Sequence, residues 1–172
     1  MFDVAQHRDE ILERWIDRVT DSYPEETAKF LRSKSDPFAN PVGAGLQEGM
    51  AQLLDGVIDG VDVDELVPAL DQVIRVRAVQ DFSPSDAVRF IFDLKGILHE
   101  VSGEPESLEV PRHVGPTIER LGLRAFDVYM NCREEMWSIR AREIRQQSVG
   151  IMERVAAWKE RREENSEKVP QS

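Results

Sequence analysis

The amino-acid sequence predicts an all-α protein, and three observations support this fold class. Apolar residues recur at helical spacing through most of the 172 residues. Combinations of Asn, Ser, Pro and Gly stand where helices would begin or end. We find no segment with the alternating apolar and polar pattern of a β-strand. A hydrophobic fraction of 41% in a chain of this length is enough for one packed domain.

The first 60 residues predict three helices. A helix is expected over residues 4–22, because its apolar residues are spaced on one face: Ile11, Leu12, Trp15, Ile16 and Val19. Tyr23 and Pro24 end it, and a short helix follows over residues 25–32. Asn40 and Pro41 are a cap and a first helical residue for the third helix, which stops at Gly60.

Two further helices are expected before residue 103. The fourth covers about Asp64 to Gln80. The stretch from Ser83 to Asp86 has the order of a capping box, with serine at the cap and proline next, so the fifth helix runs from there to about Ser102.

The rest of the chain predicts one long helix. Residues 103–113 are expected to be non-helical, and a helix follows Pro116 to at least Arg145. Residues 151–164 resemble its continuation beyond Gly150. We therefore expect a domain over residues 1–145, a helical extension over 146–165 and a disordered tail over 166–172.

Composition excludes several function classes. The net charge of −11 disfavours non-specific binding to nucleic acid and docking on anionic membranes. Cys132 is the single cysteine, so no internal disulfide or cysteine-based metal cluster is expected. The first residues lack the apolar core of a signal peptide, and no apolar run approaches the ~20 residues of a membrane span. A cytoplasmic protein is expected.

Catalytic, metal and cofactor motifs are not found, so we expect no enzyme, no metal and no cofactor. The glycines at 43–49 do not have dinucleotide-binding spacing, and no strand precedes them. His7, His99 and His113 lie far apart in the sequence. His99 is a candidate haem ligand, but its place near a helix end favours a surface histidine that interacts with the helix dipole.

Three glycines mark one side of the third predicted helix. Gly45, Gly49 and Gly56 fall within roughly 40° of one another, on the side away from the apolar stripe. Each costs about 1 kcal/mol of helix propensity relative to alanine. This pattern indicates either a loose helix with a glycine stop, or a notch that another helix or a ligand approaches closely.

Arg77 is the main candidate for a functional residue. It points to within roughly 20° of the centre of the apolar face of the fourth helix. A buried guanidinium needs an anion, because an unpaired one costs several kcal/mol. One interpretation is an internal salt bridge with Asp81 or with an acid of the fifth helix such as Asp93. The other is a pocket in which Arg77, assisted by Gln80, binds a carboxylate ligand.

Large apolar residues repeat every seven positions in the last third of the chain. They are Leu123, Met130, Trp137, Ile144, Ile151 and Trp158. This spacing predicts a seam against another helix, although Ala141, Ser148, Val155 and Arg162 make the second seam position poor. We expect the early part to pack on its own domain, and the part with Ile151, Val155 and Trp158 to contact a second copy or a protein partner.

Two segments resemble a known family. "DPFANPVG" at 36–43 and "IRVRAVQDFSPSDAVRFIFDLK" at 74–95 resemble the N-terminal domain of the RsbT co-antagonist family, over roughly residues 8–145. The resemblance implies a non-haem, globin-like helical domain that forms a homodimer and acts as a sensory input for stress signals. In full-length relatives a helical linker joins that domain to a STAS or kinase output domain.

The chain continues for only about 25 residues beyond the resemblance, and an output domain needs ~100. The expected function is therefore a non-enzymatic, stand-alone sensory or adaptor module. It would bind a small molecule or a protein partner and signal through its C-terminal helix. The alternative is a cofactor-bearing or redox protein that uses the globin-like pocket.

Overall fold

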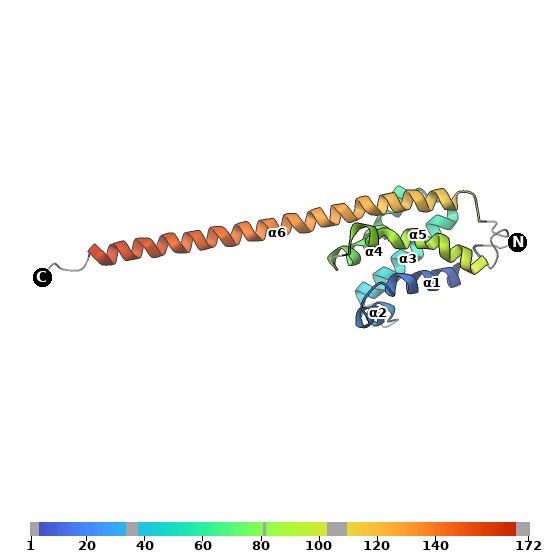
Figure 1. Cartoon of the computed structure of the whole chain (residues 1–172), viewed down its shortest axis with the longest axis horizontal. Helices are drawn as coiled ribbons and strands as arrows, with labels where there is room; N and C mark the ends of the chain where they lie inside the picture. Colours follow the sequence, from blue (N-terminus) through green and yellow to red (C-terminus); the bar gives the residue numbers. More distant parts are fainter. Residues whose placement is uncertain (1–3, 34–37, 81, 103–109, 168–172) are drawn as a thin grey trace. The chain divides into compact units, whose positions relative to one another are not determined.

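The computed structural model describes residues 4–33, 38–80, 82–102 and 110–167, and no strand occurs in these ranges. The all-α prediction is confirmed (Figure 1). The elements are α1 (Arg8–Thr20), α2 (Glu25–Arg32), α3 (Pro41–Asp59), the short 3₁₀ helix η1 (Val63–Leu66), α4 (Val67–Val79), α5 (Pro84–Ser102) and α6 (Val114–Glu167). The chain forms two compact units, Met1–Cys132 (unit 1) and Arg133–Ser172 (unit 2).

The predicted helix signals form as expected. The Asn40 side chain accepts a hydrogen bond from the Gly43 backbone N–H at 2.8 Å, and Pro41 opens α3. Gly60 ends α3 with φ 71°, a left-handed conformation that glycine adopts without a steric penalty. The Ser83 hydroxyl accepts from the Asp86 N–H at 3.2 Å and donates to its carboxylate at 2.6 Å, which caps α5.

The starts of two helices differ from the prediction, whereas the predicted continuation of the last helix is confirmed. α1 begins at Arg8 rather than at residue 4. The fourth helix starts with the 3₁₀ turn η1, whose cap is Asp62, and becomes α-helical at Val67. α6 passes Gly150 without a break, so the predicted continuation is part of the same helix.

The core of unit 1 is built from pairs of packed helices. α3 packs against α4, α1 packs against α5, and α2 lies on α1 and α3. Trp15 of α1 is fully buried, and its indole N–H donates to the Phe90 carbonyl of α5 at 2.6 Å. The centres of the two rings lie 5.9 Å apart, so this aromatic pair is one of the contacts between α1 and α5.

The first part of α6 also belongs to this core, but on a different face from the predicted seam. Its buried residues are Val114, Thr117, Ile118, Leu121, Ala125, Val128, Tyr129 and Cys132. The first part of α6 thus packs on its own domain, as predicted, but Leu123 and Met130 of the seam are 71% and 37% exposed and do not make that contact. The reason is that a second apolar series, offset from the seam, packs against the other helices.

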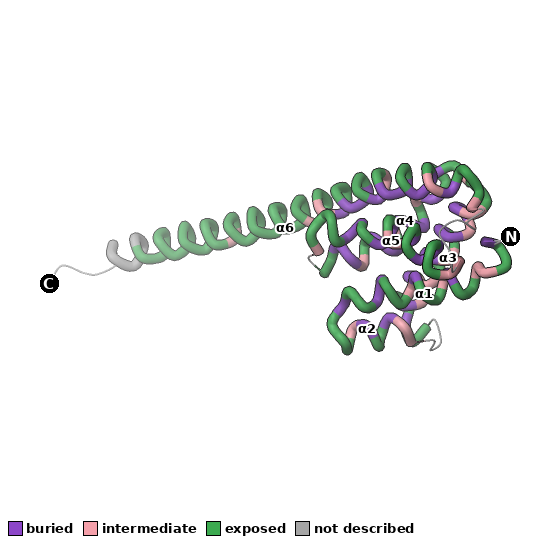
Figure 2. The backbone as a smooth tube through the Cα atoms, turned by 45° about the vertical axis from the view of Figure 1, so that its right-hand side comes forward, coloured by how far each residue is buried: buried purple, intermediate pink, exposed green. Residues whose placement is uncertain are grey.

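Unit 2 contains the C-terminal part of α6. In Figure 2 this part is almost entirely green, which marks exposed residues. The seam side chains Trp137, Ile144, Ile151 and Trp158 are between 51% and 64% exposed. Trp158 also lies under the guanidinium of Arg162, whose Cζ is 4.8 Å from the ring centre.

We expected the glycine face of α3 to lie away from the core, but the structure places most of it at a helix contact. Gly49 and Gly56 are buried, and a β-carbon at Gly49 would lie 3.0 Å from the Ala69 carbonyl oxygen of α4. A β-carbon at Gly56 would collide with Leu66. Gly45 faces open space. The notch is therefore a helix contact made by Gly49 and Gly56, and Gly45 is not part of it.

The two substitutions Gly49→Ala and Gly45→Ala should have opposite effects. Gly49→Ala pushes α3 from the α4 backbone, so we expect the free energy of unfolding to fall by about 1–3 kcal/mol. Gly45→Ala meets no neighbour and gains helix propensity, so the free energy of unfolding should rise by up to about 1 kcal/mol. Urea unfolding followed by circular dichroism measures both. Equal effects would contradict the assigned helix contact.

Candidate ligand-binding site

Arg77 of α4 is buried in unit 1, with 2% of its surface exposed. Its Nε–H donates to the Ala87 carbonyl at 3.0 Å, and one terminal nitrogen donates to the Asp86 carbonyl at 2.9 Å. The other terminal nitrogen donates to the Ser22 hydroxyl at 3.1 Å. The guanidinium therefore joins α4 to the first turn of α5 and to the turn after α1.

Three aromatic rings surround the same guanidinium. Its Cζ lies 4.3 Å from the ring centre of Phe82, 5.4 Å from Tyr23 and 5.6 Å from Phe90. Tyr23 and Phe82 also contact one another edge to face, at 5.1 Å. Aromatic faces attract a cation within about 6 Å, and more strongly when water is excluded. The inward orientation of Arg77 is thus stabilised by neutral groups.

Burial affects the acid–base properties of this cluster. Desolvation lowers the pKa of Arg77, while Tyr23, Asp86 and Asp93 oppose the shift. Arginine stays protonated in proteins because its ordinary pKa lies far above physiological pH. Burial likewise raises the pKa of the Tyr23 hydroxyl, and Arg77 opposes that shift. The site therefore holds a permanent positive charge in a poorly solvated place.

The predicted ion pair of Arg77 was with Asp81 or an acid of α5. Asp81 lies outside the described residues. Among the residues that are described, no carboxylate forms an ion pair with Arg77. Asp86 contributes its backbone carbonyl instead, and its carboxylate pairs with Arg89 at 3.4 Å.

A cavity of about 300 Å³ lies beside Arg77. Residues from α1, α4, α5 and the intervening turns line it: Arg18, Val19, Ser22, Arg77, Phe82, Asp86, Arg89, Phe90 and Asp93. This volume is at the lower end of the range for small-molecule sites. Gln80, which we expected to assist Arg77, is exposed at the C-cap of α4 and does not line this cavity.

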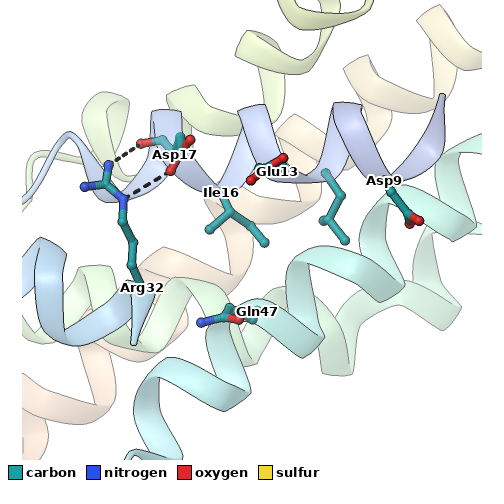
Figure 3. Close-up of a pocket in the computed structure, with 7 residues that line it drawn as sticks. Asp9, Glu13, Ile16, Asp17, Arg32 and Gln47 are labelled. Carbon is teal, nitrogen blue, oxygen red and sulfur yellow. Dashed lines mark hydrogen bonds and ion pairs between the residues drawn. The ribbon is translucent and has the colours of Figure 1, made fainter. Parts of the chain in front are cut away.

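A second cavity, of about 480 Å³, lies between α1, α2 and α3 (Figure 3). Its lining is Asp9, Leu12, Glu13, Ile16, Asp17, Arg32 and Gln47. Arg32 is paired with Asp17 at 3.1 Å, as the dashed lines in Figure 3 show, and Gln47 donates to the Leu31 carbonyl at 3.0 Å. Arg32 thus has a carboxylate partner, whereas Arg77 has none among the residues that the structure describes.

The histidines have structural or surface positions. His99 is exposed on α5 and lines neither of these two cavities. His113 makes a 2.9 Å hydrogen bond to the Ile58 carbonyl and packs against Gly60. His7 lies 3.6 Å from Glu10.

Over the described residues, no group of three or more His, Cys, Asp or Glu is placed to hold a metal ion. A search of the same residues finds no helix with the length and hydropathy of a membrane span.

Most of the residues around Arg77 were missed by sequence reasoning. Ser22, Tyr23, Arg18 and Phe90 are far from Arg77 in the sequence, and only the packing of α1 on α5 brings them together. Phe82 could have been found, because it lies between Arg77 and the capping serine of the next helix.

These features define an all-helical domain whose distinctive site is a buried cation beside a small cavity. Comparison with known families gives a more specific assignment. The chain belongs to the family described as the RsbT co-antagonist protein rsbRD N-terminal domain, whose model matches residues 9–144. The family is one of regulatory domains and is not a known enzyme family.

The chain is also similar to an uncharacterised protein of Archaeoglobus fulgidus. The two are 28% identical over 141 residues, which cover 79% of this chain and 83% of the relative. No solved structure matches the chain.

Proposed function

We propose that this protein is a non-enzymatic regulatory module that acts as a homodimer and passes its signal along α6. The observation that carries the proposal is the exposed apolar seam of α6, defined by Leu123, Met130, Trp137, Ile144, Ile151 and Trp158. Family membership supports a regulatory role in stress signalling.

The seam has the spacing of a two-helix contact. Residues seven apart stay on one side of a helix that supercoils around a partner. Isolated exposed apolar residues are common on soluble proteins, but a continuous row with two tryptophans favours a covered surface. A second copy of the chain presents the same row, and a two-fold axis along the helix pair places the two rows face to face in a parallel arrangement.

Weak positions in the seam suit a contact that changes during signalling. Ala141 and Ser148 offer little apolar surface, and Arg162 replaces an apolar residue near the end. A helix pair with such positions has a weaker free energy of association and can shift its register more readily. A protein partner would then bind at the end of α6, which carries Ile151, Val155 and Trp158, and respond to the shift there.

Charge reversal of the seam tests this proposal. In the double variant Ile144→Glu/Ile151→Glu, four carboxylates would face one another, so the dimer dissociation constant should rise roughly 100-fold or more. Gln146→Glu/Ala157→Glu adds the same charge away from the seam and should leave the dimer intact. Light scattering over a range of protein concentrations measures both. A measured molar mass of 19.7 kDa, that of one chain, for the wild-type protein at every concentration would refute the homodimer.

We also propose that unit 1 has a globin-like fold that functions without haem. Support comes from the helix pairs α3–α4 and α1–α5 that enclose one core, together with the family assignment. The position of His99 on the protein surface does not favour haem ligation. An absorption spectrum after addition of haemin tests this part, and a stoichiometric Soret band would contradict it.

A further inference from the structure

The charges that line the Arg77 cavity are unequally paired. Arg18 is bound to Glu100 at 2.9 Å, and Arg89 lies 3.4 Å from the Asp86 carboxylate. Arg77 has only neutral partners among the described residues. Asp93 makes no ion pair or hydrogen bond with any described residue, although it lines the same cavity. Among the described residues, Arg77 and Asp93 therefore each lack an ion-pair partner at contact distance, although Asp93 is near enough to Arg77 and Arg18 to act on them electrostatically.

These two groups lie in different parts of the site. Arg77 is 2% exposed and reaches the cavity beside Ser22, while Asp93 on α5 is half-buried. Each is close enough to act electrostatically on the other, since Asp93 favours the charged form of Arg77. They do not meet within ion-pair distance. A ligand that carries both charges could contact each of them.

The remaining lining limits the size and polarity of that ligand. Val19, Phe82 and Phe90 contribute apolar surface, and about 300 Å³ accommodates a molecule of only a few heavy atoms beyond its charged groups. Guanidinium donors suit a carboxylate, and a carboxylate suits an ammonium group. The lining thus combines a carboxylate site, an ammonium site and an apolar wall.

We propose that the Arg77 cavity binds a small zwitterion, specifically an α-amino acid with an apolar side chain, with its carboxylate on Arg77 and its ammonium group on Asp93. Such a ligand satisfies both charges and leaves the cavity neutral. The inference rests on the proposed regulatory function and supplies the chemical class of the signal. Because the cavity lies in unit 1, dimerisation through α6 and ligand binding are separate measurements.

The test is a titration of the full chain with L-valine, followed by the ¹⁵N–¹H signals of arginine Nε groups. The Arg77 Nε–H is buried and donates to Ala87, so its signal should exchange slowly with water and report the site directly. We expect saturable shifts of this signal. Isovalerate lacks the ammonium group and isobutylamine lacks the carboxylate, so each should bind at least about tenfold more weakly than L-valine.

Variants distinguish this site from general binding. Asp93→Asn should weaken L-valine binding about tenfold and leave isovalerate binding unchanged, because only the ammonium partner is lost. Asp127→Asn removes an exposed carboxylate that does not line the cavity and should have no effect. No saturable shift with L-valine, equal binding of isovalerate, or unchanged L-valine binding in Asp93→Asn would each overturn the inference.

Light scattering on the same samples separates the two proposals. A dimer that does not bind L-valine would overturn the ligand assignment and leave the proposed dimer intact. A monomer that binds L-valine would do the reverse.

Discussion

Replacing Trp15 by alanine is expected to lower the free energy of unfolding of unit 1 by about 4 kcal/mol. The side chain is fully buried, stacks near Phe90 and donates a hydrogen bond to its carbonyl. The substitution leaves a cavity at the contact of α1 with α5 and removes that hydrogen bond. Urea unfolding monitored by circular dichroism measures the loss. A fall of this size exceeds most single substitutions.

Two other tryptophans provide a matched control. Trp137 and Trp158 are 61% and 51% exposed, so alanine at either should change the free energy of unfolding of unit 1 by less than about 0.5 kcal/mol. At protein concentrations below the dissociation constant of the proposed dimer, Trp15→Ala should be the one of these three variants that destabilises unit 1. If Trp137→Ala destabilised unit 1 as much as Trp15→Ala, the assignment of the seam as exposed surface would be wrong.

The loss of stability on substitution of Arg77 should depend strongly on the size of the new side chain. Arg77→Ala removes the guanidinium from among the three aromatic rings and with it three hydrogen bonds. We therefore expect the free energy of unfolding to fall by about 3 kcal/mol. Arg77→Met fills the same space without a buried charge and should cost about 1 kcal/mol or less. The carbonyls of Asp86 and Ala87 keep the main-chain hydrogen bonds of α5 in both variants.

The pair of variants separates structural support from ligand binding at Arg77. If methionine preserves stability but abolishes the response to L-valine, the charge serves the ligand. If methionine costs as much as alanine, the hydrogen bonds of the guanidinium hold the fold together, and Arg77 is a structural residue. Stability is read from the unfolding curves, and L-valine binding to the methionine variant is followed by the backbone amide signals of Ser22 and Ala87, because that variant has no Arg77 Nε–H.

The helix boundaries could be predicted from the sequence because the signals that set them are local. The caps at Asn40 and Ser83 and the stop at Gly60 form within the chain segment that contains them, so their residues identify them without tertiary information. The seven-residue seam was visible for the same reason. That the first part of α6 packs in unit 1 was predicted, but its packing face was not, because two apolar series overlap on that helix and periodicity does not say which one is covered.

The site was less predictable. Helix geometry placed Arg77 inward correctly, but its neighbours come from α1 and α5, whose contact depends on the whole core. The expected partner was an anion of the adjacent helix, whereas backbone carbonyls and aromatic rings supply the observed contacts. Single-sequence reasoning overlooks such partners, because carbonyls occur at every residue.

Interchain cross-linking tests the central claim, that two copies pair in parallel through the seam of α6. Ile151→Cys in a Cys132→Ser background places one thiol per chain on the seam, and facing positions of a parallel helix pair are close enough for a disulfide. Glu153→Cys in the same background lies roughly 200° around the helix. Under mild oxidation, we expect a disulfide-linked dimer for Ile151→Cys and only monomer for Glu153→Cys. Equal cross-linking of the two variants, or none in either, would contradict it.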